Sequence, residues 1–196
     1  MQRHFILGIA LFSASVGAFA QGTAATVQRD VNQQERIEQG LKSGALSTAE
    51  AARLEREQSA VSRQQSRALA DGKLTPAEQA RLNAAQNKAS RDIAAAKHNG
   101  VTGNPQSASS QRMQADVQRN INQDKRIEAG VQNGSLTNRE VAKLEHGQAR
   151  VERKEARAGR DGHVGAAEQA GIQRTENRQS KRIRHEKHDA QIRNPS

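Results

Sequence analysis

The chain has 196 residues, a formal net charge of +10 and an aromatic content of only 2%. Its three Phe residues all stand within the first twenty positions, and it has no Cys, Trp or Tyr. Beyond those positions the composition excludes base stacking on aromatic side chains, disulfide bonds and thiolate chemistry. The low content of Ile, Leu and Val also predicts a small apolar core.

The first predicted element is a signal peptide over residues 1–20. Arg3 precedes an apolar run from Phe5 to Phe19, and Ala18-Phe19-Ala20 matches a small-residue cleavage site. This order is typical of secretory signal peptides, and the run is short for a transmembrane helix. We therefore expect a periplasmic or secreted mature chain that begins at Gln21 and has no transmembrane segment.

The mature chain contains two similar copies offset by ninety residues. Val27-Gln28-Arg29-Asp30 recurs as Val117-Gln118-Arg119-Asn120, and Lys97-His98 recurs as Lys187-His188. The segment between the copies is rich in Gly, Pro and Ser, a composition typical of flexible linkers. The predicted organisation is a first copy over 21–98, a linker over 99–114, a second copy over 115–190 and a tail over 191–196.

Each copy contains one turn motif twice: a Gly, an aliphatic residue two positions later, a capping residue and then a Glu. The Gly closes one helix in the left-handed conformation, and the hydroxyl and the Glu form a capping box on the next helix. The residues of the four motifs are Gly44, Ser47 and Glu50; Gly72, Thr75 and Glu78; Gly134, Thr137 and Glu140; and Gly162 and Glu168, where Gly165 replaces the hydroxyl.

Between these turns the chain is rich in Ala, Gln, Glu, Arg and Lys, which favour helices. The expected helices span residues 25–42, 48–70, 76–97, 115–132, 138–160 and 166–190. The predicted fold class is all-α, with two tandem copies of a small three-helix unit joined by a flexible linker. The apolar faces of these helices are narrow, since half of the residues on the face that includes Leu54 and Val61 are polar or Ala. Marginal stability is the consequence.

The turn motif also resembles the second half of an EF-hand calcium loop, which ends in a chelating Glu. In the best match, over residues 67–78, the first ligand positions are Arg67 and Leu69, and a cation there repels calcium. We therefore interpret the motifs as capping turns. The chain as a whole resembles small bacterial periplasmic repeat proteins with a signal peptide and degenerate EF-hand-like Gly-x-Leu-Thr-x-x-Glu units. This resemblance implies an exported helical repeat protein and supplies no activity.

The positive charge is densest near the end of the second copy. Five cations there are the candidate residues for binding an anionic surface: Arg174, Arg178, Lys181, Arg182 and Arg184. On a helix, Arg174, Arg178, Lys181 and His185 share one face. Such a stripe attracts anionic envelope components through polyvalent electrostatics. Export disfavours genomic nucleic acid as the partner, and the apolar face is too poor for membrane insertion.

Two other functions remain open. His185 and His188 lie three residues apart on a helix, and with Asp189 they form a candidate site for a divalent transition metal. A third hypothesis is that exposed aliphatic residues of the turns, such as Leu46 and Leu136, contact a partner protein. No Gly-rich phosphate loop, Gly-x-Ser-x-Gly elbow or His-Glu-x-x-His motif is present. We therefore expect a non-enzymatic protein without a cofactor, for which the metal-binding function is the alternative.

Overall fold

The computed structural model describes residues 15–189. They form six helices and no strand, which confirms the all-α class. The helices are α1 (Ser15–Ser43), α2 (Thr48–Ala68), α3 (Pro76–Lys97), α4 (Ala108–Gln132), α5 (Asn138–Ala158) and α6 (Ala166–Lys187). Most of the predicted signal peptide and the whole predicted tail lie outside the described residues. Within the described part, α1 starts before the expected cleavage site.

Local capping fixes where the later helices of each copy begin. At the start of α2, Glu50 Oε2 accepts a hydrogen bond from the Ser47 N–H at 2.9 Å, while Ser47 Oγ accepts one from the Glu50 N–H. The same reciprocal capping box starts α3 and α5. At α6 Gly165 has no side chain, so only the bond from its N–H to Glu168 Oε2 is made. The glycines of the four motifs have φ between +76° and +90°.

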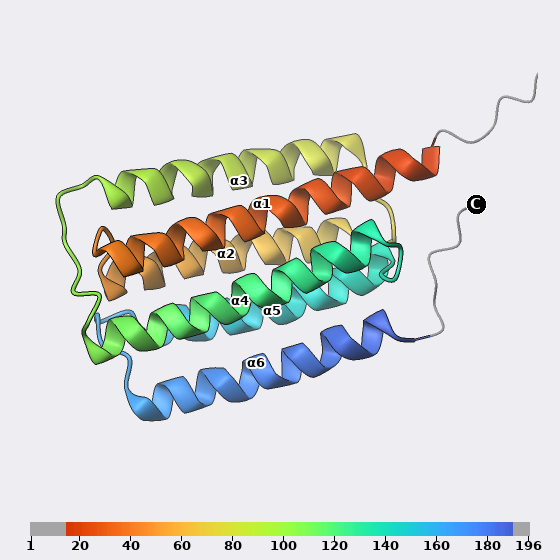
Figure 1. Cartoon of the computed structure of the whole chain (residues 1–196). Coiled ribbons are helices and arrows are strands. Elements are labelled where there is room, and N and C mark those ends of the chain that lie inside the picture. The colour runs from red at the N-terminus through yellow and green to blue at the C-terminus, as the bar shows by residue number, and fades with distance from the viewer. Residues whose placement is uncertain (1–14, 190–196) are drawn as a thin grey trace, which may run out of the picture.

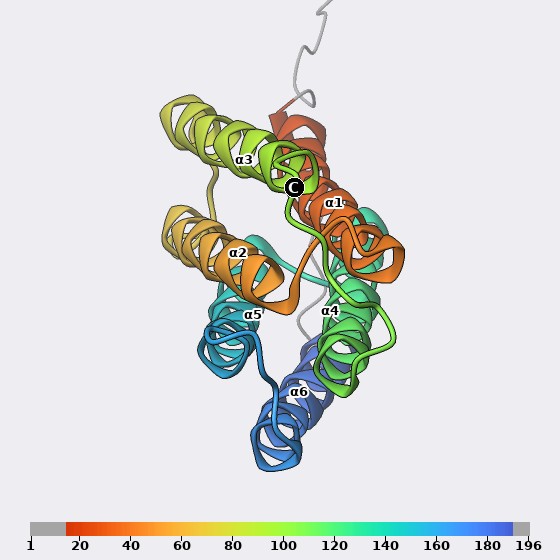
Figure 2. The same ribbon diagram turned by 90° about the vertical axis from the view of Figure 1, so that its left-hand side faces the viewer.

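The six helices form a layered bundle in which the two copies are packed together (Figures 1 and 2). Helix α2 packs chiefly against α5, and α1 packs chiefly against α4, so the four central helices come from both copies. Helix α3 covers α1 and α2, and α6 covers α4 and α5 at the opposite end of the bundle. The contacts between the copies are therefore more extensive than those within either copy.

The segment expected to be a flexible linker has defined structure. Ser107 caps α4, which begins at Ala108, so the helix includes residues that composition assigned to the linker. Before it, the Gly103 N–H donates to the Gly44 carbonyl at 2.8 Å, and a Cβ on Gly103 would lie 2.3 Å from the Leu46 carbonyl oxygen. The connection thus lies against the first turn of the first copy.

The apolar core is shared between the copies. One buried cluster joins Ile37 and Leu54 to Met113 and Ile121. A second cluster is made in the same way, with Val27 and Leu82 on one side and Ile127 and Leu144 on the other.

The turn leucines belong to this core. Leu46 is 1% exposed and Leu136 is 0% exposed, so the expectation that they are exposed for a partner is wrong. Each turn folds back through a hydrogen bond from the leucine N–H to the carbonyl of a helical glycine, Gly40 or Gly130. The absent glycine side chain leaves the space that the leucine fills.

Candidate functional site

Acidic and basic side chains are segregated between the interior and the surface. Twelve of the 21 acidic residues are buried, whereas no Lys or Arg in the described part of the chain is buried. The surface is therefore more strongly positive than the net charge indicates. The buried acids are Asp30, Glu38, Glu55, Asp116, Asp124, Glu128, Glu140, Glu145, Glu152, Glu155, Glu176 and Glu186.

Amide and hydroxyl groups, more than cations, hydrogen-bond to the innermost carboxyl groups. Gln34 Nε2 donates to Glu55 Oε2 at 3.1 Å, and Asn120 Nδ2 donates to Glu155 Oε2 at 2.8 Å. Ser62 Oγ, from the first copy, donates to Glu152 Oε2, from the second, at 2.9 Å. These bonds satisfy part of the hydrogen-bonding need of the carboxyl groups and leave their charge uncompensated.

Burial consequently raises the pKa of several buried acids. It raises the pKa of Asp30 and that of Glu55 to about 7, against the opposing effect of their amide donors. Burial, reinforced by the nearby Glu176, raises the pKa of Asp116 to about 8. For Glu152 and Glu155, burial and then the neighbouring Glu55 raise the pKa well above the usual range. Near neutral pH these carboxyl groups therefore offset the surface cations only in part.

A cation-lined cleft lies between α2 and α5. It has a volume of about 590 Å³ and no acidic lining residue. Burial and the neighbouring Arg153 and Arg67 lower the pKa of Arg63, so like charges are crowded there. An anion in the cleft would relieve this repulsion. The lining residues are Arg56, Ser59, Arg63, Arg153, Ala156, Arg157 and Arg160.

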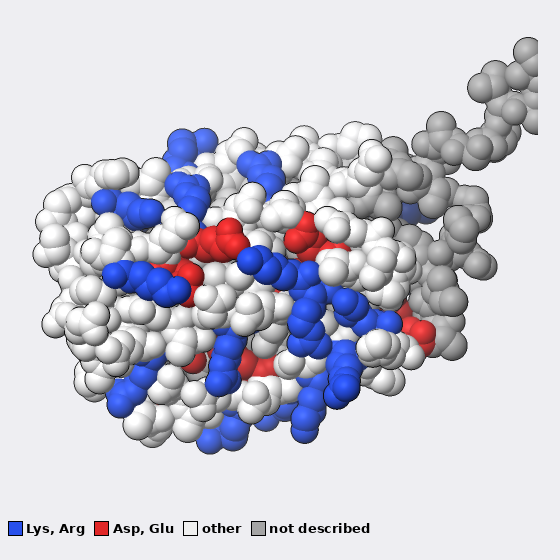
Figure 3. All heavy atoms as spheres, viewed as in Figure 1, with Lys and Arg blue, Asp and Glu red and all other residues white. Residues whose placement is uncertain are grey.

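The five predicted cations of α6 are all exposed. Four of them line two different clefts, and Arg174 lines neither. Arg178 and Arg182 line a cleft of about 190 Å³ together with Arg150 of α5. Lys181 and Arg184 line another, of about 540 Å³, together with Arg126 of α4. Neither cleft has an acidic lining residue. Figure 3 shows Lys and Arg side chains over α4 and α6, and others over α3, on the face of the molecule that Figure 1 presents.

The structure does not group the two histidines of the predicted metal site with the acidic side chains that could hold an ion. His185 and His188 are exposed, and His188 lies in the same cleft as Lys181, Arg184 and Lys187, whose charges disfavour a cation. Among the described residues, the group of side chains able to hold a metal ion is Glu140, Glu186 and Asp189. It includes the predicted Asp189 and neither histidine.

Sequence reasoning missed the arginines of the cleft between α2 and α5. Their helical spacing is visible in the sequence, since Arg153, Arg157 and Arg160 follow one another at intervals of four and three residues. Arg56 and Arg63, however, stand about ninety residues earlier, and only the packing of α2 on α5 brings the two sets together.

Comparisons with protein-family models, with curated proteins and with solved structures gave no match. None of the described helices combines the length and the apolar character that crossing a membrane requires.

Proposed function

We propose that this is a non-enzymatic exported protein that binds polyanionic, phosphate-bearing surfaces of the cell envelope. The observation that carries the proposal is the set of three clefts lined by arginine and lysine without an acid, on a molecule that buries most of its carboxyl groups. Guanidinium groups donate paired hydrogen bonds to phosphate oxygens. Clefts with several arginines should therefore bind phosphate groups more tightly than other anions of the same charge.

The proposal includes the organisation of the chain. A cleavable signal peptide over residues 1–20 would export it, and two tandem three-helix units would form the mature protein. Equivalent hydrogen bonds in the two copies support the repeat: Arg36 Nη1 donates to Ser90 Oγ at 2.6 Å, and Arg126 Nη1 donates to Ser180 Oγ at 2.7 Å. The second copy uses this fixed Arg126 in a cleft wall.

Cosedimentation with phosphatidylglycerol vesicles tests the function. A variant with Arg153, Arg157 and Arg160 changed to Gln should bind about a hundredfold more weakly, because each cation near an anionic surface contributes about 1 kcal/mol. A second variant changes the five α6 cations to Gln and should also lose binding. Binding of the unmodified protein should fall steeply as salt rises.

The matched control changes Lys73, Arg91 and Lys97 to Gln. It removes the same number of charges on or beside α3, away from the three clefts. It should bind within a few-fold of the unmodified protein, because salt screens the attraction between charges that lie more than about 10 Å apart. Equal losses in the control and the α5 variant would show that net charge, not the clefts, determines binding. Unchanged retention of all the variants on the vesicles would refute the proposal.

A further inference from the structure

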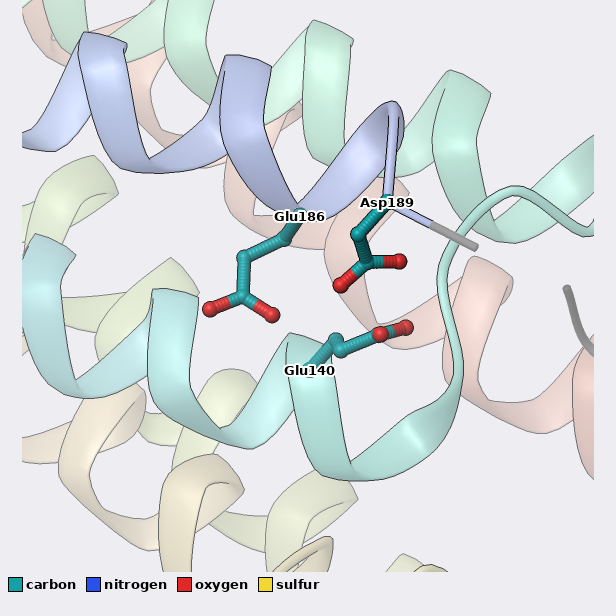
Figure 4. Close-up of side chains that lie close together, drawn as sticks. All are labelled: Glu140, Glu186 and Asp189. Atoms are coloured by element: carbon teal, nitrogen blue, oxygen red, sulfur yellow. The ribbon is translucent and has the colours of Figure 1, made fainter. Parts of the chain in front are cut away.

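Three carboxyl groups converge where the end of α6 meets the start of α5. Glu186 and Asp189 extend from the end of α6 toward Glu140, which stands in the first turn of α5 (Figure 4). One oxygen from each of the three lies within 4.8 Å of the others. Oxygen ligands lie about 2.3–2.6 Å from a bound Ca²⁺, so two ligands of one ion are separated by no more than about 5 Å. The spacing therefore fits one ion.

Glu140 presents a free oxygen at this position. Its Oε2 accepts the capping hydrogen bonds from the Thr137 N–H at 2.6 Å and from Thr137 Oγ1 at 2.8 Å. Its Oε1 is buried and has no hydrogen-bond partner among the described residues, in a side chain that is 1% exposed. A buried oxygen without a donor is costly, and a cation is the partner that would satisfy it.

In the first copy, the corresponding glutamate oxygen accepts a hydrogen bond. There the equivalents of Glu140, Glu186 and Asp189 are Glu50, Ala96 and Asn99. Asn99 Nδ2 donates to Glu50 Oε1 at 2.6 Å, so the corresponding oxygen is satisfied by an amide. In the second copy Asp189 replaces this amide donor with a carboxyl group. Glu186 adds another carboxyl group where the first copy has the methyl group of Ala96.

From these contacts we infer that Glu140, Glu186 and Asp189 bind a hard divalent cation, with calcium as the expected ion. An all-carboxylate set suits Ca²⁺, Mg²⁺ or Mn²⁺, whereas Zn²⁺ and Ni²⁺ prefer sites with imidazole or thiolate ligands. Two of the three ligands belong to the last turn of α6 and the residues after it, and Ca²⁺ tolerates such irregular geometry better than Mg²⁺. The site is independent of the proposed anion binding.

Lys143 competes for this site. Its Nζ lies 3.5 Å from Glu186 Oε2, and its side chain is 58% exposed, so it can move into solvent when an ion binds. This competition predicts weak affinity, with a Kd of about 10⁻⁴–10⁻³ M, the range of extracellular calcium modules.

The test is isothermal titration of the full chain with CaCl₂, MgCl₂ and ZnCl₂. The double variant Glu186→Ala, Asp189→Asn installs the pattern of the first copy, in which an amide satisfies the glutamate, so it should fold while losing calcium affinity at least tenfold. Lys143→Gln removes the competing cation and should tighten calcium binding. A His185→Ala, His188→Ala variant should bind calcium like the unmodified protein.

Absence of calcium binding at millimolar concentration, or calcium affinity unchanged in the double variant, would overturn the inference. So would zinc binding that exceeds calcium binding and disappears in the histidine variant. If the double variant does not fold, the Lys143→Gln comparison decides: tighter calcium binding supports the site, and an unchanged affinity contradicts it.

Discussion

At the scale of single residues, glycines in helix interiors illustrate how packing reverses a local preference. Gly130 in α4 stands where a Cβ would lie 2.5 Å from Cδ1 of the buried Leu136. Gly171 in α6 has nothing closer to such a Cβ than the flexible ends of Arg174 and Lys154, both at 3.8 Å. Helix propensity favours Ala over Gly at both positions by about 1 kcal/mol.

We predict opposite effects of Ala at these two glycines. Gly130→Ala should lower the free energy of unfolding by about 1–3 kcal/mol, because the added methyl group displaces the buried side chain of Leu136. Gly171→Ala should raise it by about 0.5–1 kcal/mol, since only the propensity term operates. Chemical denaturation followed by circular dichroism measures both changes. Stabilisation by Gly130→Ala would show that the turn around Leu136 is looser than described.

At the scale of helices, α6 has the weakest start of those that follow a turn motif. Gly165 provides no side-chain cap, although its φ of −74° and ψ of 160° are values that Ser adopts readily. In α5 the equivalent backbone carries Thr137 with φ of −79° and ψ of 162°, and its hydroxyl accepts from the Glu140 N–H.

Gly165→Ser should therefore stabilise the protein. The expected gain is about 0.5–1 kcal/mol, which combines a new hydrogen bond to the helix N-terminus with the reduced entropy of the unfolded chain. The reciprocal change, Thr137→Ala, should cost about 1 kcal/mol. Thermal unfolding of the two variants beside the unmodified protein measures both changes. A Gly165→Ser variant less stable than the parent would contradict the assignment of this residue as a cap.

The sequence predicted helix starts where local chemistry decides them. The expected starts at residues 48, 76, 138 and 166 coincide with those observed. The first three depend on a hydroxyl cap and a glutamate three residues later, and the fourth depends on the glutamate alone. For α4, composition predicts a Ser-rich linker and a start at residue 115, whereas the helix begins at Ala108 because Ser107 is itself a good cap. Composition therefore misled where capping chemistry was informative.

At the scale of the whole molecule, the packing of the two copies against each other could not be predicted from the sequence. Ser59 Oγ donates to the Ala149 carbonyl, and Ser62 Oγ donates to Glu152, so equivalent positions of α2 and α5 meet at the centre of the bundle. This packing buries carboxyl groups that a single amphipathic pattern assigns to solvent. It also brings the arginines of the α2–α5 cleft together. The free Glu140 oxygen likewise depends on α6 meeting α5, so none of these sites follows from one helix alone.

The buried carboxyl groups predict an unusual dependence of stability on pH. In the folded state the pKa of Asp30, that of Glu55 and that of Glu176 rise to about 7, and that of Asp116 rises to about 8, with burial as the largest cause for each. In the unfolded chain these groups have a pKa of about 4. Between these values the native state binds more protons, so stability falls as pH rises.

The fold should therefore be most stable below about pH 4 and lose stability as the pH rises from there through 7 to 8. Each group contributes about 1.4 kcal/mol per unit of pKa shift. Thermal unfolding at pH 5, 6, 7 and 8 in about 0.3 M salt, which screens the repulsion among surface cations, measures the trend. Glu55→Gln keeps an oxygen to accept the hydrogen bond from Gln34 and cannot ionise, so it should reduce the loss of stability between pH 5 and pH 8. A midpoint that rises toward pH 8, or a variant as sensitive to pH as the parent, would mean that these carboxyl groups are hydrated or paired in solution.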